Sequence, residues 1–275
     1  MKPLILFILL FTWVSACAPA SHKHRKRYRN TYPDALLMQK QKKTIIPSQP
    51  KVTRQEPIAV VSGSIKSSML PTILNERDKT LMILINAGKY LIGKDNHSTD
   101  VDFTPHKLAS KFKNLKNFYI DRTEISVAHF RQYQPDYDEK PFTAGKDCPN
   151  CPAMAINWIQ ASKYCHWAGK RLPREEEWEA AARGITHYSY PWGDTFQANH
   201  SNLWGAGDGY LFSAPVGSFQ AGASASGVMD MAGNVWEWVD TIKRGQLQPD
   251  TRIVKGGGWT SNEKQASISF RNPVN

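Results

Sequence analysis

Two carboxylates occur in a segment that is otherwise apolar. Asp230 and Glu237 lie in GVMDMAGNVWEWV (227–239), among valine, methionine and tryptophan. If this segment is a strand, Glu237 shares a face with Val235 and Val239. A lone buried carboxylate there costs several kcal/mol unless it has a partner. The partner predicted for Glu237 is an arginine, a set of backbone N–H groups or a metal ion.

A second kind of chemistry is offered by Cys148 and Cys151, a C-x-x-C pair in a loop that contains proline. A redox-active pair needs a helix N-terminus to lower the pKa of one thiol, and a zinc site needs a second pair of ligands. The neighbouring sequence indicates neither. We expect a small structural disulfide, with a redox role, free thiols or a metal as alternatives.

The N-terminus has the pattern of an export signal. Lys2 precedes an apolar run, Leu4 to Trp13, that is too short to span a bilayer. The run leads to Val-Ser-Ala-Cys, which resembles the bacterial lipobox with Cys17 as the lipidated residue; an ordinary signal peptide is the alternative. Residues 1–16 are then the signal peptide. Ala18 after the cysteine implies the periplasmic face of the outer membrane, within the bacterial cell envelope.

The net charge of +11 is concentrated in one region. Residues 21–56 hold ten Lys or Arg and two acidic residues, which leaves residues 57–275 nearly neutral. With several prolines, this composition predicts a lipid-anchored, mostly disordered tether over residues 17–75. The basic run is expected to be a solvated tether. Docking on envelope proteins or on an anionic lipid or wall surface is the alternative, and export excludes nucleic acid.

The elements that must position these residues begin near Thr80. LMILINAGKYLIG (81–93) predicts a strand, a turn and a strand, and NFYIDRTEIS (117–126) predicts another strand. Ser126 is a suitable N-cap for a short helix that follows it. Two further helices are predicted over residues 159–168 and 175–183.

Regular patterning is scarce after residue 185. Eight of the nine tryptophans lie between Trp158 and Trp259, and a core of large aromatic side chains can hold irregular backbone. The sequence therefore predicts an α+β domain with much loop and no long sheet.

Several blocks, in one order, resemble the formylglycine-generating enzyme, or sulfatase-modifying factor, family. They are YCHWAGKRLPREEEWEAAARG (164–184), YPWGD (190–194), APVGSF (214–219), GVMDMAGNVWEWV (227–239) and VKGGGW (254–259). INAGKYLIG (85–93) and FYIDRTEISVAHFRQY (118–133) match upstream. The resemblance implies one compact domain over residues 76–275, with an irregular, loop-rich fold of C-type-lectin-like topology.

The resemblance also implies a structural calcium site in GVMDMAGNVWEWV. Its ligands would be the side chains of Asp230 and Glu237 and the backbone carbonyls of Gly233 and Val235. Oxygen-only ligands at this spacing suit a hard cation. A salt bridge from Glu237 to an arginine is the alternative.

A second structural calcium site is implied in SNLWGAGDGY (201–210). Its ligands would be the side chains of Asn202 and Asp208 and the carbonyls of Leu203 and Tyr210. An Asx-turn at Asp208 without an ion is the alternative.

The family's catalytic cysteines have no counterpart here. Active members oxidise a substrate cysteine to formylglycine with two cysteines that bind Cu(I), and these positions align with Ser261 and Ala266. A hydroxyl and a methyl are poor ligands for this soft ion, so we expect no catalytic residues and no copper. The domain is expected to be a non-catalytic binding or scaffold module that uses loops 138–152 and 240–253. A formylglycine-generating oxidase, or a divergent oxidoreductase acting on protein cysteine, is the alternative.

Two further departures from the family carry expectations. The family ends in a Gly-Phe-Arg strand that is expected to be missing here, and the usual partner of Cys165 lies in that strand, so Cys165 is expected to be a buried free thiol. Arg174 stands where the family has a Thr or Ser helix cap, at an expected cost of ~1 kcal/mol.

Overall fold

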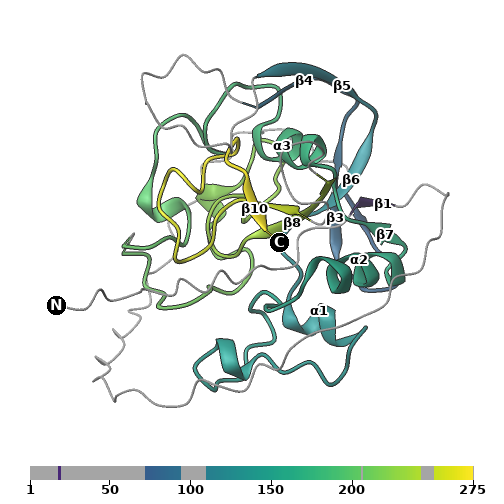
Figure 1. Cartoon of the computed structure of the whole chain (residues 1–275), viewed down its shortest axis with the longest axis vertical. Helices are drawn as coiled ribbons and strands as arrows, with labels where there is room; N and C mark the ends of the chain where they lie inside the picture. Colours follow the sequence, from purple (N-terminus) through teal and green to yellow (C-terminus); the bar gives the residue numbers. More distant parts are fainter. Residues whose placement is uncertain (1–17, 20–71, 94–109, 206, 243–250, 275) are drawn as a thin grey trace, which may run out of the picture. The chain divides into compact units, whose positions relative to one another are not determined.

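The structure is a computed structural model that describes residues 18–19, 72–93, 110–205, 207–242 and 251–274 (Figure 1). The predicted signal peptide, Cys17 and the basic run of residues 21–56 lie outside the described residues. No helix in the described part of the chain is both long enough and apolar enough to cross a membrane.

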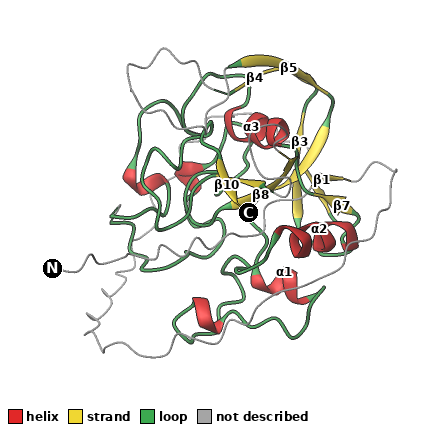
Figure 2. Ribbon diagram, viewed as in Figure 1, coloured by secondary structure: helices red, strands yellow, loops and turns green. Residues whose placement is uncertain are grey.

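The described elements are short. In chain order they are β1 (Ala18–Pro19), β2 (Thr72–Leu74), β3 (Leu81–Ile85), β4 (Gly88–Ile92), β5 (Lys111–Leu115), β6 (Phe118–Asp121), α1 (Val127–Arg131), η1 (Lys140–Phe142), α2 (Trp158–Trp167), β7 (Lys170–Arg171), α3 (Glu175–Arg183), η2 (Ala198–His200), η3 (Gln220–Gly222), β8 (Glu237–Ile242), β9 (Arg252–Lys255) and β10 (Asn272–Val274). Long loops join them, as Figure 2 shows. The predicted mixed, loop-rich fold is confirmed.

The strands form small antiparallel sheets with the orders β10-β9-β8, β2-β3-β6, β4-β5 and β1-β7. The two strands predicted in LMILINAGKYLIG exist as β3 and β4, but they belong to different sheets. The turn between them therefore carries the chain from one sheet to the next instead of closing a hairpin.

Two hydrophobic clusters form most of the core. Phe130 of α1 and Tyr164 of α2 pack in one cluster with Trp236 and Trp238. Trp178 of α3 packs in the other cluster with side chains of β3, β4, β6 and β9. The tryptophans thus hold loops and short elements together, as the sequence predicts.

Two predicted boundaries need correction. β2 pairs with β3 and belongs to the compact domain, so the domain begins before residue 76. In GNVWEWV, the strand begins only at Glu237, because Gly233 and Asn234 have φ values of +81° and +60° and form a turn. Val235 through Val239 are all buried, so both faces of this segment are covered.

The C-terminal end of the described chain pairs as a strand. β10 lies at the edge of the sheet, next to β9, with Asn272 opposite Val254. Whether the family's later Gly-Phe-Arg strand is missing stays a prediction.

The caps of the two longer helices differ. Asn157 and Gln160 form a complete capping box at α2. At α3 only half of the capping box is present. The Glu177 side chain accepts from the backbone N–H of Arg174 at 2.8 Å, but the Arg174 side chain has no acceptor atom for the backbone N–H of Glu177.

Replacing the exposed Arg174 with serine is therefore expected to raise the free energy of unfolding by about 0.5–1 kcal/mol. The serine hydroxyl would accept from the backbone N–H of Glu177 and complete the box. Urea unfolding of Arg174→Ser checks this, with Arg174→Ala as the control that removes the arginine without adding an acceptor. Equal stability of the two variants would contradict the capping argument.

Candidate functional site

The positions that align with the family cysteines, Ser261 and Ala266, lie side by side next to Gly257. A Cβ added to Gly257 would be 3.3 Å from the Ser261 Cβ and 3.2 Å from the Ala266 Cα, so both residues border the same point. Gly257 has a φ of +81°, in the left-handed region that favours glycine. The structure thus brings together the two positions that the sequence comparison pairs.

The chemical groups at these positions are occupied. The buried Ser261 hydroxyl accepts from the backbone N–H of Gly258 at 3.0 Å, and the Ser261 N–H donates to the Gly258 carbonyl at 2.7 Å. Ala266 is buried in a small cluster with Leu203 and Ala232. The pair offers a hydroxyl committed to a turn and a methyl, and neither is a thiolate.

Three buried carboxyl groups form a second cluster. Burial raises the pKa of Glu124 well above its ordinary value, and the charges of Asp230 and Glu237 raise it further. Burial also raises the pKa of Asp230 to about 6, although the Gly217 N–H donates to its Oδ2 at 2.6 Å and opposes this shift. Among the described residues, no Lys, Arg or His forms an ion pair with Glu124 or Asp230. The cluster therefore gathers three acidic groups, and a bound cation would stabilise their charged forms.

One partner of Glu237 is an indole. The Nε1–H of Trp178 donates to Glu237 Oε2 at 2.6 Å, so a helix side chain reaches the first residue of β8. The sequence prediction considered an arginine, backbone N–H groups or a metal, and it did not foresee this contact.

Asn234 connects these groups. Its Nδ2 donates to Glu124 Oε2 at 2.6 Å and to the Ala214 carbonyl at 3.2 Å, and its Oδ1 accepts from the Ala214 N–H at 2.7 Å and from Asn202 Nδ2 at 3.2 Å. The Val235 N–H donates to the other oxygen of Glu124 at 3.0 Å. The turn at Asn234 therefore holds the buried Glu124 in place.

The expected donors of the first calcium site fit a hard cation. Among the described residues, no three His, Cys, Asp or Glu side chains are arranged to hold a metal ion. The expected set, however, needs only the two carboxylates of Asp230 and Glu237, and its other two ligands are carbonyls. The carbonyl oxygens of Gly233 and Val235 accept no hydrogen bond from any described residue. Oxygen donors beside an excess of negative charge are the surroundings that calcium prefers.

At the second expected calcium site, Asp208 has the geometry of an Asx-turn, which was the alternative to a calcium ligand. Asp208 Oδ1 accepts from the Tyr210 N–H at 2.9 Å, which is an Asx-turn, and Oδ2 accepts from the Leu203 N–H at 3.2 Å. Asn202 donates through Nδ2 to the Phe212 carbonyl at 2.8 Å. Hydrogen bonds within the loop thus account for the placement of Asn202 and Asp208.

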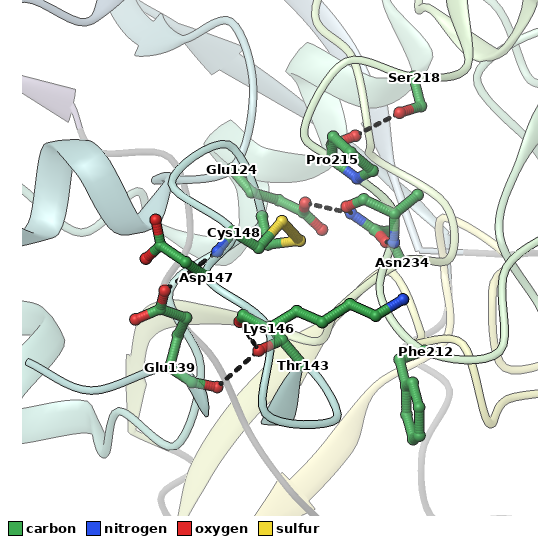
Figure 3. Close-up of a disulfide and its surroundings, with 12 residues drawn as sticks. Glu124, Glu139, Thr143, Lys146, Asp147, Cys148, Phe212, Pro215, Ser218 and Asn234 are labelled. Carbon is green, nitrogen blue, oxygen red and sulfur yellow. Dashed lines mark hydrogen bonds between the residues drawn. A yellow bond between two sulfur atoms is a disulfide. The ribbon is translucent and has the colours of Figure 1, made fainter. Parts of the chain in front are cut away.

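Cys148 and Cys151 form a disulfide (Figure 3). The Cys148 N–H donates to the buried Glu139 at 3.1 Å, and the Cys151 carbonyl accepts from the Val127 N–H at the start of α1 at 2.8 Å. Asn150, between them, accepts from the Val216 N–H at 2.8 Å. The disulfide therefore closes a short segment of the 138–152 loop, and backbone hydrogen bonds join this segment to α1 and to the 214–219 segment.

The prediction of a free thiol at Cys165 is wrong. Cys165 is fully buried on α2 and is disulfide-bonded, with a partner that lies outside the described residues. The prediction failed because it considered only the partner that the family normally provides.

The sequence of this chain matches a family of known proteins. Residues 71–275 match the family model described as the sulfatase-modifying factor enzyme 1-like domain. The chain belongs to this family. The match begins next to β2, in agreement with the domain boundary seen in the structure.

Relatives in the sulfatase-modifying factor family include active and inactive proteins. The chain is 42% identical over 117 residues to the inactive Cα-formylglycine-generating enzyme 2 of Bos taurus. This alignment covers 39% of the chain and 38% of the relative. It is 42% identical over 153 residues to the formylglycine-generating enzyme of Thermomonospora curvata, covering 46% and 50%. It is 34% identical over 176 residues to the hercynine oxygenase of Mycolicibacterium thermoresistibile, covering 55% and 39%. The chain thus spans half or less of these relatives.

Solved structures show the same fold. PvdO from Pseudomonas aeruginosa matches with a TM-score of 0.62 and 23% identity over 74% of this chain and 92% of that one. The Treponema denticola variable protein 1 matches with a TM-score of 0.59 and 18% identity over 74% and 92%. At this identity the likeness shows the fold alone.

Sequence reasoning missed the role of Glu124, which lies in the 117–126 segment that was predicted only as a strand. The missed signal is local, because Glu124 lies between Asp121 at the end of β6 and the apolar Ile125, where a carboxylate needs a partner. The partners themselves, Asn234 and Val235, come from a distant part of the chain and leave no trace near Glu124.

Proposed function

We propose that this sulfatase-modifying factor domain does not generate formylglycine and serves as a binding or scaffold module in the bacterial cell envelope. The observation that carries the proposal is the pair Ser261 and Ala266, adjacent at Gly257 and without a sulfur atom. The inactive mammalian relative supports the proposal by showing that the family contains proteins named as inactive.

The chemistry of copper explains why this pair matters. Cu(I) in the family's reaction would need two thiolates, and a hydroxyl or a methyl supplies neither. The described cysteines, Cys148, Cys151 and Cys165, are all in disulfides and so offer no thiolate either. The recognition loops of such a module would include residues 138–152, which contain the Cys148–Cys151 disulfide.

The deciding experiment is an activity assay on the full chain. The protein, copper and oxygen are mixed with a peptide carrying Cys-x-Pro-x-Arg, and mass spectrometry follows the conversion of the thiol to an aldehyde. The Thermomonospora curvata enzyme serves as the positive control. We expect no conversion by this chain, and conversion at a rate comparable to the control would overturn the proposal.

A divergent oxidoreductase is the second candidate, favoured by the identity to a hercynine oxygenase. It would consume oxygen in the presence of a redox metal and a thiol substrate. Oxygen-electrode measurements with iron or copper and a panel of thiols separate it from the binding module, which would consume none above the metal-only background.

Membrane attachment through Cys17 is part of the proposal, with residues 21–56 as a tether that could also meet an anionic lipid or wall surface. The chain has four cysteines and Cys148 pairs with Cys151, so lipidation of Cys17 and a disulfide from Cys165 to another cysteine of this chain exclude each other. Growth of the expressing bacterium with an alkyne fatty acid would label the wild-type chain and not Cys17→Ser. Fractionation would then place the labelled chain in the outer membrane. Labelling of both proteins, or of neither, would contradict attachment at Cys17.

We also propose that calcium occupies the site of Asp230, Glu237, Gly233 and Val235 and stabilises the loops around it. At a free calcium concentration a hundred times the Kd, the bound ion would add about 2.7 kcal/mol to the free energy of unfolding. Chelator is therefore expected to lower Tm by several degrees, and calcium to restore it. Asp230→Asn is the matched variant, whose Tm should not respond to chelator. A wild-type Tm that does not respond either would contradict the site.

A further inference from the structure

The disulfide partner of Cys165 follows from the cysteines that the sequence contains. The chain has four cysteines, and Cys148 and Cys151 are bonded to each other. Cys165 is itself disulfide-bonded, and its side chain is fully buried on α2. No cysteine follows Cys165 in the sequence, so the partner that the family places in a later strand has no counterpart here. Within one chain, the remaining cysteine is Cys17.

The backbone that directly follows Cys17 is held on the compact domain. β1 begins at Ala18 and pairs with β7, with Ala18 opposite Arg171. Figure 1 shows β1 alongside β7. Because the two strands are antiparallel, following β1 back toward the N-terminus follows β7 forward, toward Leu172. The pairing therefore leads from Ala18 in the direction of Leu172.

Leu172 and Cys165 belong to the same part of the core. Both side chains are buried in one hydrophobic cluster. α2 ends at Trp167 and β7 begins at Lys170, so a short turn keeps Cys165 close to β7. Neighbouring Cα atoms are about 3.8 Å apart, and a disulfide joins Cα atoms that are about 4.4–6.8 Å apart. A cysteine joined directly to Ala18 is therefore well placed to meet the end of α2.

We propose that Cys17 is the disulfide partner of Cys165 in every chain that carries no lipid on Cys17. Formation of the bond removes two protons and two electrons from the two thiols. A disulfide of an oxidising partner protein accepts them and becomes two thiols. The bacterial periplasm, to which the chain is predicted to be exported, is an oxidising compartment that sustains such bonds.

The lipid and the disulfide would use the same sulfur atom, so each chain carries one or the other. A lipidated chain keeps Cys165 as a buried thiol, whereas a chain without lipid is cross-linked and has no attachment through Cys17. The inference thus divides the proposed membrane attachment into two covalent forms. It rests on the proposed function only in taking Cys17 as the lipidation site, and it is independent of binding and catalysis.

The test compares the two forms after export of the full chain in a bacterium. Partition with a nonionic detergent that separates on warming sends lipidated chains to the detergent phase and lipid-free chains to the aqueous phase. Each phase is unfolded in urea with an alkylating reagent and no reductant, digested with trypsin and mapped by mass spectrometry. The informative peptides are YCHWAGK (164–170) and the peptide that contains Cys17.

In the aqueous phase we expect the two peptides to be joined, to separate on reduction, and to leave no alkylated Cys165. In the detergent phase we expect alkylated Cys165, because the lipid occupies its partner. Alkylated Cys165 in the aqueous phase, a covalent dimer through Cys165, or chains found only in the detergent phase would each overturn the inference. Joined peptides with no chain in the detergent phase would support it and contradict attachment through Cys17, so the two proposals fail separately.

A pair of variants tests the same bond without separating the phases. Cys17→Ser is expected to gain one free thiol, at Cys165, which reacts with the alkylating reagent only after unfolding because it is buried. Cys148→Ser is the matched control, since it breaks the other disulfide and should free Cys151 while Cys165 stays joined to Cys17. A Cys17→Ser chain in which Cys165 is still disulfide-bonded would show that its partner is another molecule and overturn the inference.

Discussion

Asn234→Ala is expected to lower the free energy of unfolding by about 3–5 kcal/mol, a large part of the stability of an ordinary domain. The side chain makes four hydrogen bonds, and one of them is to the buried Glu124. Removing the amide leaves a buried carboxyl group with one fewer donor, which is the expensive part of the loss. The turn adds a second cost, because φ at Asn234 is +60°, a conformation that alanine disfavours by about 1 kcal/mol.

Asn234→Gly separates the two costs. Glycine adopts the same φ without strain but also lacks the amide, so it should be about 1 kcal/mol more stable than Asn234→Ala. Equilibrium urea unfolding of the wild type and both variants gives the comparison. Loss of the hydrogen bonds of Asn234 is expected to cost well over about 1 kcal/mol. If the free energy of unfolding of Asn234→Ala lies within about 1 kcal/mol of the wild-type value, Asn234 does not hold the cluster together.

Lys170→Met is expected to have an effect of similar size, about 3–5 kcal/mol, for an electrostatic reason. The Lys170 ammonium is buried and lies 2.7 Å from Asp78 and 2.9 Å from Asp121, and it also donates to Thr80 at 2.9 Å. Methionine fills much of the same volume but removes the ammonium group that pairs with the buried carboxylates of Asp78 and Asp121. Lys163→Met makes the same change at an exposed position of α2 and should cost little.

The pH dependence of this variant has a definite sign. Burial alone would raise the pKa of Asp78, but the charge of Lys170 and its hydrogen bonds outweigh burial and lower it. This pair therefore stabilises the wild type fully above the ordinary aspartate pKa of about 3.9, and the contribution is lost as the pH falls through the lower pKa of the folded protein. In Lys170→Met the effect of burial on the pKa of Asp78 dominates. Protonation of Asp78 at low pH then removes its buried charge and so stabilises the variant. The stability gap between wild type and variant should narrow as the pH falls, and a gap that widens would contradict the pairing.

Local rules predicted what depends on neighbouring residues. Ser126 caps α1, and α3 spans Glu175–Arg183 as expected, because capping and helix-ending residues act within one turn. The left-handed turn at Asn234 was missed, since the apolar run around it reads as continuous strand. The family resemblance placed Ser261 and Ala266 correctly together, which no local rule would do.

Contacts between distant residues could not be predicted. The pairing of Lys170 with Asp78 and Asp121, and of Glu124 with Asn234, depends on how separate loops meet. The sequence around Lys170 does not reveal its burial, because its partners Asp78 and Asp121 lie far from it in the chain.

The buried polar contacts also bear on how the chain reaches its folded state. Glu124 and Asn234 are 110 positions apart, Arg271 and Glu175 are 96 apart, and Tyr164 and Asp78 are 86 apart. Each pair must close a long loop before either member can leave water at a tolerable cost, and such non-local closure slows folding. A ribosome must therefore release almost the whole domain before all of these buried contacts can form, so the interior closes late in synthesis.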